Sequence, residues 1–287
     1  MSATLHRGGA GRHVLYVLRG NPVTAVAAAG TALLVAVALL APWLVPYDPV
    51  ASDVSSALQP PGAAHWAGTD QLGRDIGSRI LMAARLDLLI AASAVSLSFV
   101  VGAAVGGFCG YRGGRLDRWV GRFVDVLMAF PLFVLAMGIV AALGNTVPNI
   151  VLATAIINFP LYVRVARAET SLRRDAGFVD AARVAGHRDM AVLLRQVAPN
   201  IMPIMTVQMS LTMGYAILNA AGLSFIGLGV RPPMPEWGIM VAEGASFIVS
   251  GEWWVALFPG AVLMLAVFCF NLLGDGLRDI VDPRRRT

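Results

Sequence analysis

The segment LDLLIAASAVSLSFVVGAAVGGFCG, residues 86–110, contains a single charged side chain, Asp87. It is long enough to cross a membrane, since about 20 helical residues span a hydrocarbon core of about 30 Å. Five further apolar runs of similar length lie at 23–44, 123–143, 147–166, 201–226 and 253–273. A chain in lipid must satisfy its backbone hydrogen bonds internally, so runs of this length indicate helices rather than barrel strands. The sequence therefore predicts an all-α polytopic membrane protein with six transmembrane helices.

The composition of the whole chain agrees with this fold class. Of its 287 residues, 57% are hydrophobic and 14% are charged, whereas soluble domains carry about 25% charged residues. The chain has no lysine, so the Lys+Arg total of 22 consists of arginine alone. A phosphate-binding loop needs a lysine, and Schiff-base catalysis needs one as well. Both functions are therefore excluded for this chain.

The arginines also orient the chain in the membrane. With the N-terminus inside, 18 of the 22 arginines fall in cytoplasmic segments, and the other four are Arg74, Arg79, Arg85 and Arg231. Arginine is retained on the cytoplasmic side, so both termini are expected in the cytoplasm. The predicted parts are a cytoplasmic N-terminus (1–22), a first transmembrane helix (23–44), an external loop (45–85), a core of five transmembrane helices (86–275) with a cytoplasmic loop at 167–200, and a cytoplasmic tail (276–287).

Two external loops contain sequence patterns that predict secondary structure of their own. In residues 74–85 the apolar side chains fall on one helical face and the polar ones on the other, which predicts a helix lying along the membrane interface. The polar face consists of Arg74, Asp75, Ser78, Arg79 and Arg85. The last external loop, residues 227–252, combines clustered prolines with apolar residues, which predicts a partly re-entrant segment.

The cytoplasmic loop at 167–200 contains a short helical pattern that ends at Gly186. Its apolar face consists of Phe178, Ala181, Ala182 and Ala185. Asp180 and Arg183 fall on the opposite face. Glycine favours the left-handed conformation that ends many helices. A face of alanines permits close approach of another surface, so we expect a docking element for a cytoplasmic partner; a solvated charged loop is the alternative.

Few polar groups fall inside the predicted spans. Asp87 and Asp125 each lie about one turn from a helix end, and Asp125 follows Arg122 at a spacing that lets the two side chains meet. The other polar candidates are three amides, Asn158, Asn219 and Asn271. These amides suit hydrogen bonds between helices and also contacts to a transported substrate, and both interpretations stay open.

The sequence lacks the patterns of an enzyme or of a metal site. It contains neither an HExxH pair nor a GxSxG elbow, and Cys109 and Cys269 have no metal-ligand spacing. No Asp, Glu or His forms a relay near the middle of a predicted span, which disfavours proton-coupled transport. A self-sufficient ion-coupled carrier or channel is the alternative class that these residues leave open.

Six motifs stand in a characteristic order along the chain. They are GTDQLGRD at 68–75, GYRGG at 110–114, VDVLMAFP at 124–131, DAARVAG at 180–186 followed by APN at 198–200, LSFIGLG at 223–229, and NLLGDGLRD at 271–279. Together they resemble the permease subunits of ATP-binding-cassette (ABC) importers, specifically the C-type subunit of the dipeptide, oligopeptide and nickel group. The segment at 180–200 resembles the cytoplasmic "EAA" loop of that family. Its usual glutamate is Asp180 here, and Gln196 and Ala198 replace the usual hydrophobic residues before the proline.

This resemblance implies a non-catalytic subunit of the bacterial inner membrane with the ABC importer type I permease fold. A homologous permease would complete the pathway, two ATPase subunits would bind on the cytoplasmic side, and an extracytoplasmic solute-binding protein would deliver the substrate. No cofactor is expected on this chain, since ATP and Mg²⁺ would be bound by the ATPases. Short peptides are the expected substrates, with glutathione or a nickel chelate as alternatives. The implied coupling helix comprises Phe178, Asp180, Ala181, Ala182, Arg183, Ala185, Gly186 and His187.

Overall fold

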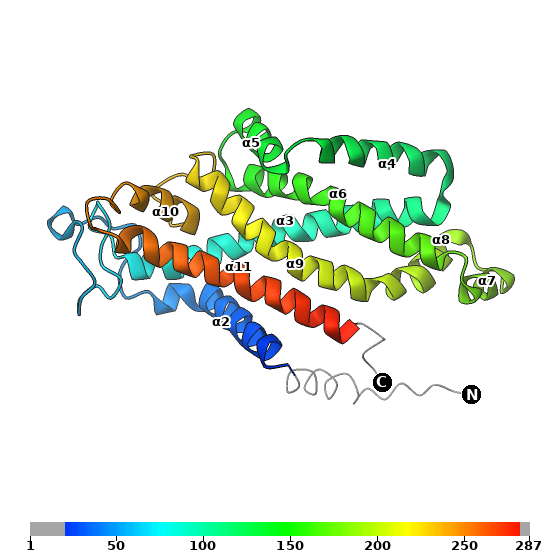
Figure 1. The fold of residues 1–287 in the computed structure, drawn as a ribbon, viewed down its shortest axis with the longest axis horizontal. Coiled ribbons are helices and arrows are strands. Elements are labelled where there is room, and N and C mark those ends of the chain that lie inside the picture. Colours follow the sequence, from blue (N-terminus) through cyan, green and yellow to red (C-terminus); the bar gives the residue numbers. More distant parts are fainter. Residues whose placement is uncertain (1–20, 282–287) are drawn as a thin grey trace.

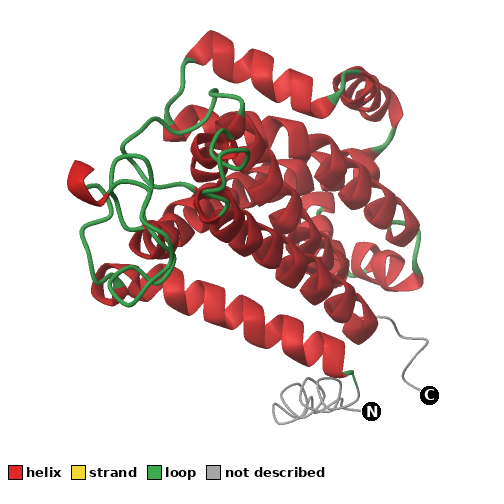
Figure 2. Cartoon of the chain, turned by 60° about the vertical axis from the view of Figure 1, so that its left-hand side comes forward, coloured by secondary structure: helices red, strands yellow, loops and turns green. Residues whose placement is uncertain are grey.

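The computed structural model describes residues 21–281, and its regular elements are all helical (Figure 2). Within that range five helices are long and apolar enough to cross a membrane, and a bent pair of helices supplies a sixth span. The all-α membrane fold predicted from the sequence is therefore confirmed. Most of the predicted cytoplasmic N-terminus and the end of the predicted tail lie outside the described residues.

The five long helices extend beyond the apolar runs that predicted them. They are α2 (Pro22–Leu44), α3 (Ile76–Arg112), α6 (Val147–Arg173), α9 (Ala198–Phe225) and α11 (Trp254–Val281). Helix α6, for example, continues past Ala166, where the predicted span ends, to Arg173. Its last turns are polar, and a helix has no reason to end where the membrane does. Hydropathy thus located the spans but not the helix ends.

The third predicted span is not one straight helix. Helices α4 (Gly114–Ala129) and α5 (Leu132–Leu143) meet at a bend of 89°. Phe130 lies between them in an extended conformation, with φ −81° and ψ 143°, because a residue before proline is pushed out of the helical region. Pro131 therefore divides the predicted helix at 123–143 into two elements.

The predicted interfacial helix at 74–85 is not a separate element. Asp75 caps the N-terminus of α3, where its carboxylate accepts a hydrogen bond of 2.7 Å from the backbone N–H of Ser78. From Ile76 the helix runs without interruption to Arg112. The polar face that predicted surface exposure is instead covered by the external loop, since Arg74 and Arg79 are buried.

The long helices run side by side, and the shorter elements gather at the two ends of the bundle (Figure 1). One end holds α7 (Gly177–Val184), α8 (Asp189–Val192) and the π-helical turn η2 (Leu193–Val197). The other holds the loop at 45–75, with the 3₁₀ turn η1 (Val54–Ser56), and α10 (Trp237–Ala245). Helix α2 lies against α3 and α11, and α4 lies at the edge beside α6. The arginine pattern assigns the α7 end to the cytoplasm.

The centre of the bundle is the contact between α3 and α6, the most extensive contact between two helices of the described chain. Glycines at every fourth position of α3 let the two backbones approach closely. A Cβ atom on Gly106 would lie 2.3 Å from the carbonyl oxygen of Val163, and one on Gly110 would lie 2.5 Å from that of Arg167. Gly102 faces Tyr162 in the same way, at 2.5 Å from its Cβ. These three glycines set the distance between α3 and α6.

We predict that Gly106→Val destabilises the folded protein by about 1–3 kcal/mol or more, because the new side chain overpacks a backbone contact. Thermal unfolding of the purified protein in mild detergent measures the effect. Gly138→Ala in α5 is the matched control, since a Cβ there meets no atom within 4 Å. An unchanged melting temperature for Gly106→Val would show that the contact is not tight.

Candidate functional site

Helix α7 presents an apolar surface at the cytoplasmic end of the bundle. Val179 is fully buried and Ala182 is 8% exposed, whereas Phe178 is 40% and Val184 is 89% exposed. The predicted apolar face is thus divided: Ala182 packs inward beside Val179, while Phe178, together with Ala181 and Ala185, faces outward. Ala182 thus lies at the inner edge of the predicted face, and the other three side chains remain accessible. The outward side is nevertheless apolar enough to dock on another surface.

The turn after α7 has the conformation that its glycine predicted. Gly186 has φ +84°, in the left-handed region that favours glycine. Its N–H donates to the carbonyl of Arg183 at 2.9 Å, and the N–H of His187 donates to the carbonyl of Ala182 at 3.2 Å. This pair of hydrogen bonds is a Schellman motif. It ends α7 sharply and turns the chain toward α8.

Arg183 fastens α7 to the end of α3. Its guanidinium lies over the ring of Tyr111 at 5.5 Å and donates to the Tyr111 hydroxyl at 3.3 Å. That hydroxyl donates in turn to the carboxylate of Asp189 at 3.1 Å. Asp180 accepts a hydrogen bond of 3.3 Å from Arg183 and is otherwise exposed. The hydrogen bond with Tyr111 raises the pKa of Arg183, and arginine is charged at physiological pH in any case.

Helix α7 is connected to both helices that border a large groove. Residues 174–176 join it to α6, and α8 and η2 lead into α9 as one continuous 37-residue span, Asp189–Phe225. The groove has a volume of about 730 Å³. Its polar lining comes from α6, α9 and α11, namely Arg164, Glu169, Arg173, Asn200, Gln208 and Arg278. A displacement of α7 therefore acts directly on the walls of the groove.

The three candidate pathway amides lie on three different helices. Asn158 of α6 is buried, and its amide donates to the carbonyl of Thr154 in its own helix at 2.8 Å. Asn271 of α11 packs against Gly214 of α9, where a Cβ would come within 3.0 Å of the amide oxygen. Asn219 of α9 is half-buried. None of the three belongs to the lining of the groove between α6 and α9.

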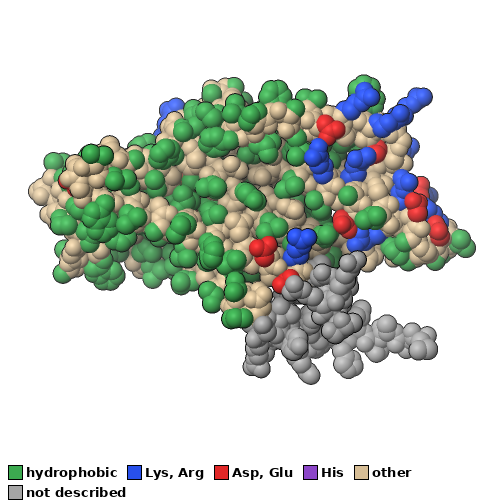
Figure 3. Space-filling model, in the orientation of Figure 1, with side chains coloured by type: hydrophobic (Ala, Val, Ile, Leu, Met, Phe, Trp, Pro, Cys, Tyr) green, Lys and Arg blue, Asp and Glu red, His purple; other side chains and the backbone are tan. Residues whose placement is uncertain are grey.

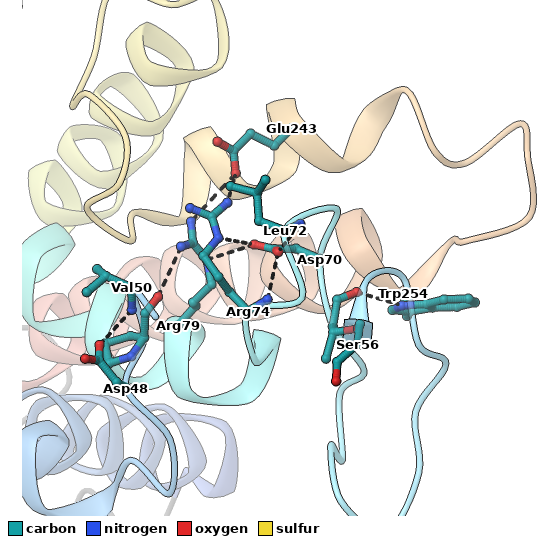
Figure 4. Close-up of polar contacts among 11 residues, drawn as sticks. Asp48, Val50, Ser56, Asp70, Leu72, Arg74, Arg79, Glu243 and Trp254 are labelled. Atoms are coloured by element: carbon teal, nitrogen blue, oxygen red, sulfur yellow. Dashed lines mark hydrogen bonds and ion pairs between the residues drawn. The ribbon is translucent and has the colours of Figure 1, made fainter. Parts of the chain in front are cut away.

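Four charged side chains form a buried network at the external end, drawn in Figure 4. Arg74 is 2% and Arg79 is 1% exposed, and both lie between Asp70 and Glu243. The Arg74 guanidinium lies 2.6 Å from the Asp70 carboxylate and 3.2 Å from that of Glu243. Arg79 lies 3.6 Å and 3.7 Å from the same carboxylates and donates to the carbonyl of Pro49 at 3.2 Å. This outer charge network joins the external loop and α3 to α10.

Helix α10 is held to α3 by a second set of buried contacts. Glu236 caps α10 by accepting hydrogen bonds from the N–H groups of Gly238 and Ile239 at 2.9 and 2.8 Å. The N–H of Trp237 donates to the carboxylate of Asp87 at 3.0 Å. Burial raises the pKa of Glu236. Asp87 is therefore buried beneath α10, although it lies near the end of its predicted span.

Asp125 also has a different partner from the predicted one. It pairs with Arg164 of α6 at 2.6 Å rather than with Arg122 of its own helix. No local pattern predicts this pair, since Asp125 and Arg164 lie in two different predicted spans, 123–143 and 147–166. The outer charge network was missed for the same reason: Glu243 lies far from Arg74 in sequence and stands alone among apolar residues.

Within residues 21–281 no group of three or more His, Cys, Asp or Glu side chains is arranged to hold a metal ion. Cys109 and Cys269 are both buried as free thiols.

Comparison with known proteins gives two family matches. Residues 102–287 match the binding-protein-dependent transport system inner membrane component, and residues 10–61 match the N-terminal TM domain of oligopeptide transport permease C.

Individual relatives cover most of the chain. The probable D,D-dipeptide transport system permease protein DdpC of Escherichia coli strain K12 is 39% identical over 96% of this chain and 92% of its own length. The di/tripeptide transport system permease protein DppC of Pseudomonas aeruginosa strain UCBPP-PA14 is 42% identical over 88% and 85%. The glutathione transport system permease protein GsiD of Pectobacterium atrosepticum is 41% identical over 89% and 85%.

The outer charge network yields a prediction about stability. Arg74→Met should destabilise the protein by about 3–5 kcal/mol, because it removes the closest partner of buried Asp70 and leaves Arg79 alone to balance two carboxylates. Arg85→Met is the matched control, since it makes the same exchange at an exposed arginine of α3. Thermal unfolding in detergent compares the two variants. Equal melting temperatures would mean that the network contributes nothing to the fold.

Proposed function

The chain belongs to the family of binding-protein-dependent transport system inner membrane components, and from this premise we propose that it forms half of the translocation pathway of an ATP-driven importer of short peptides. A sibling permease supplies the other half. ATP and Mg²⁺ are bound by two separate ATPase subunits. A solute-binding protein delivers the peptide to the external end, where α10 and the loop at 45–75 lie.

The observation that carries the ATPase partnership is the outward surface of α7. Phe178 and Val184 are exposed at the cytoplasmic end, beyond the polar ends of the long helices. Figure 3 shows arginine and carboxylate side chains around that end of the molecule. An apolar centre surrounded by polar and charged side chains is the usual composition of a protein interface. The coupling residues in this account are Phe178, Asp180, Ala181, Ala182, Arg183, Ala185, Gly186 and His187.

The contacts of α7 support a lever mechanism. The Arg183–Tyr111 contact ties α7 to the end of α3, and the Schellman turn at Gly186 fixes the direction in which the chain enters α8. The π-helical turn η2 (Leu193–Val197) leads directly into α9, and such a turn is a common place for a helix to bend. When the ATPases close, α7 moves and α9 bends at η2, so the groove beside α6 opens or closes. This is a two-state switch within a rigid frame.

The substrate class rests on the relatives. Their names include transport of D,D-dipeptides, of di- and tripeptides and of glutathione. We assign short peptides to this chain, with glutathione as the second candidate because its transporters are about equally similar. A nickel chelate is the remaining alternative. Asn158, Asn219 and Asn271 are our candidates for side chains that contact the substrate.

Isolation of the complex from native membranes in mild detergent tests this proposal. We expect a second permease, two ATPases and a solute-binding protein to co-purify, and the ligand extracted from the binding protein identifies the cargo by mass spectrometry. A chain that is alone and competent for transport would instead be a self-sufficient carrier, and the proposal would be wrong.

Charge reversal on α7 tests the docking surface. We predict that Asp180→Lys lowers the amount of co-purified ATPase about tenfold, since a like charge placed at an interface repels the partner. Asp175→Lys is the control, because it makes the same exchange at an exposed residue outside α7. Equal recovery of ATPase with both variants would contradict the assigned surface.

Substitution of Gly186 tests whether α7 transmits movement from the ATPases to the groove. We predict that Gly186→Val uncouples ATP hydrolysis from uptake, because a left-handed conformation costs a side-chain-bearing residue about 1–2 kcal/mol. No atom lies within 4 Å of the added Cβ, so the effect comes from the backbone alone. Uptake per ATP hydrolysed in proteoliposomes is the measurement.

Two further variants separate this effect from general damage. Gly186→Asn should retain coupling, since asparagine tolerates the left-handed region. Gly177→Val adds the same bulk at an equally open glycine with no positive φ and should behave as wild type. Full coupling in Gly186→Val would refute the role of this turn.

A further inference from the structure

Helix α4 carries a row of arginines on its outward side. Arg115, Arg118 and Arg122 recur at helical spacing, with Trp119 between them, and the four side chains enclose a shallow pocket of about 230 Å³. All four are exposed, and the Arg122 guanidinium lies 5.9 Å from the centre of the Trp119 ring. We refer to these four residues as the α4 arginine row.

The carboxylates of α4 do not neutralise this row. Asp117 is bound by Arg167 of α6, whose Nη2 lies 2.6 Å from its carboxylate. Asp125 is bound by Arg164, also of α6. Both acidic groups are thus paired with α6, although the Asp125 side chain is 66% exposed and that of Asp117 is 16% exposed. Among the described residues no carboxylate forms an ion pair with a member of the α4 arginine row, which leaves three positive charges on the outward side.

An apolar crevice lies next to the row on the same helix. It begins at Phe123, directly after Arg122, and has a volume of about 370 Å³ between α3, α4 and α6. Its lining side chains are Leu97, Ser98, Val101, Phe123, Leu127, Leu152, Ala155, Ile156 and Phe159. The single hydroxyl among them, on Ser98, is directed to the carbonyl oxygens of Ala94 and Ala155 at 2.7 and 2.9 Å. The crevice thus presents hydrocarbon and no unused polar group.

The order of these two features matches the depth profile of one membrane leaflet. The arginine row lies in the first half of α4, near the cytoplasmic end of the bundle, and the crevice follows toward the membrane interior. A tryptophan at the boundary is typical of the membrane interface. Anionic headgroups attract arginines beside the cytoplasmic leaflet, and acyl chains fill apolar surface below them.

We propose that α4 binds an anionic phospholipid of the cytoplasmic leaflet. Its phosphate is held by Arg115, Arg118 and Arg122, and one acyl chain lies in the crevice beside Phe123 and Leu127. A helix of the sibling permease is the competing occupant of this surface. The lipid is favoured because the row offers three positive charges that form no ion pair with a described carboxylate, and an anionic headgroup supplies the negative charge that an apolar membrane helix lacks. Of the proposed function, this assignment depends only on the orientation of the chain in the membrane and not on the identity of the transported substrate.

Native mass spectrometry of the complex measures the binding. The complex, purified with its co-purifying subunits, is titrated with dioleoyl phosphatidylglycerol or with dioleoyl phosphatidylcholine, which has the same acyl chains. We expect tighter retention of phosphatidylglycerol by wild type. Arg118→Gln with Arg122→Gln should weaken it roughly 25-fold, at about fivefold for each arginine near an anionic headgroup.

Arg188→Gln with Arg195→Gln is the matched control, since both arginines are exposed at the cytoplasmic end and the loss of charge is the same. The control should retain phosphatidylglycerol as wild type does. Equal loss in both double variants would reveal general surface attraction rather than a site and would overturn the proposal. Undiminished binding in the row variant would also overturn it.

A crosslinking experiment tests the proposal even if the complex does not assemble with Arg118→Gln and Arg122→Gln. Replacing Trp119 with p-benzoylphenylalanine, which keeps all three arginines, places a photoreactive group between them. Irradiation in native membranes should attach a phospholipid to this chain, detected as a mass increase. A crosslink to the sibling permease instead would show that a protein helix occupies the surface.

Discussion

The close contact between α3 and α6 determines where the rest of the molecule lies. In lipid the helices gain little from hydrophobic burial, so they associate through tight packing, and small residues make that packing possible. Gly102, Gly106 and Gly110 bring the backbone of α3 against α6. The end of α3 then carries Tyr111, which holds α7 through Arg183. The same pair of helices forms two walls of the apolar crevice beside α4.

Charges serve different purposes at the two ends of the bundle. At the external end Arg74 and Arg79 are buried and balanced by two carboxylates, so they fix one arrangement of the loop and α10. Removing a partner from such a cluster costs far more than the intact cluster contributes. At the cytoplasmic end the arginines are mostly exposed, where each is available to a lipid or to a protein. The external end is thus built for rigidity and the cytoplasmic end for contact.

The sequence predicted the helices well and their tertiary partners poorly. Hydrophobic runs identify membrane spans because every backbone group in lipid must be paired within the helix, and Gly186 was predictable because a left-handed helix end favours glycine. The bend at Pro131 had a local signal in its proline that a hydropathy average obscures. The partners of Glu243 and Asp125 had no local signal, since both ion pairs join segments far apart in the chain. Val179 was not predicted to pack inward, because the predicted apolar face of α7 was defined by its alanines.

The contacts at the two ends of the bundle indicate where the proposed transport cycle would move the chain. The external cap, meaning the loop at 45–75 together with α10, is bound to α3 by the outer charge network and by Trp237. It is bound to α11 by the hydrogen bond from Trp254 to the carbonyl of Thr69. Opening this cap within one subunit would expose several buried charges together. At the cytoplasmic end, in contrast, α9 needs only to bend at η2, where the regular helical pattern is already interrupted. In the transport cycle proposed above, the less costly movement is therefore at the groove between α6 and α9, with the external loop and α10 moving together with α3.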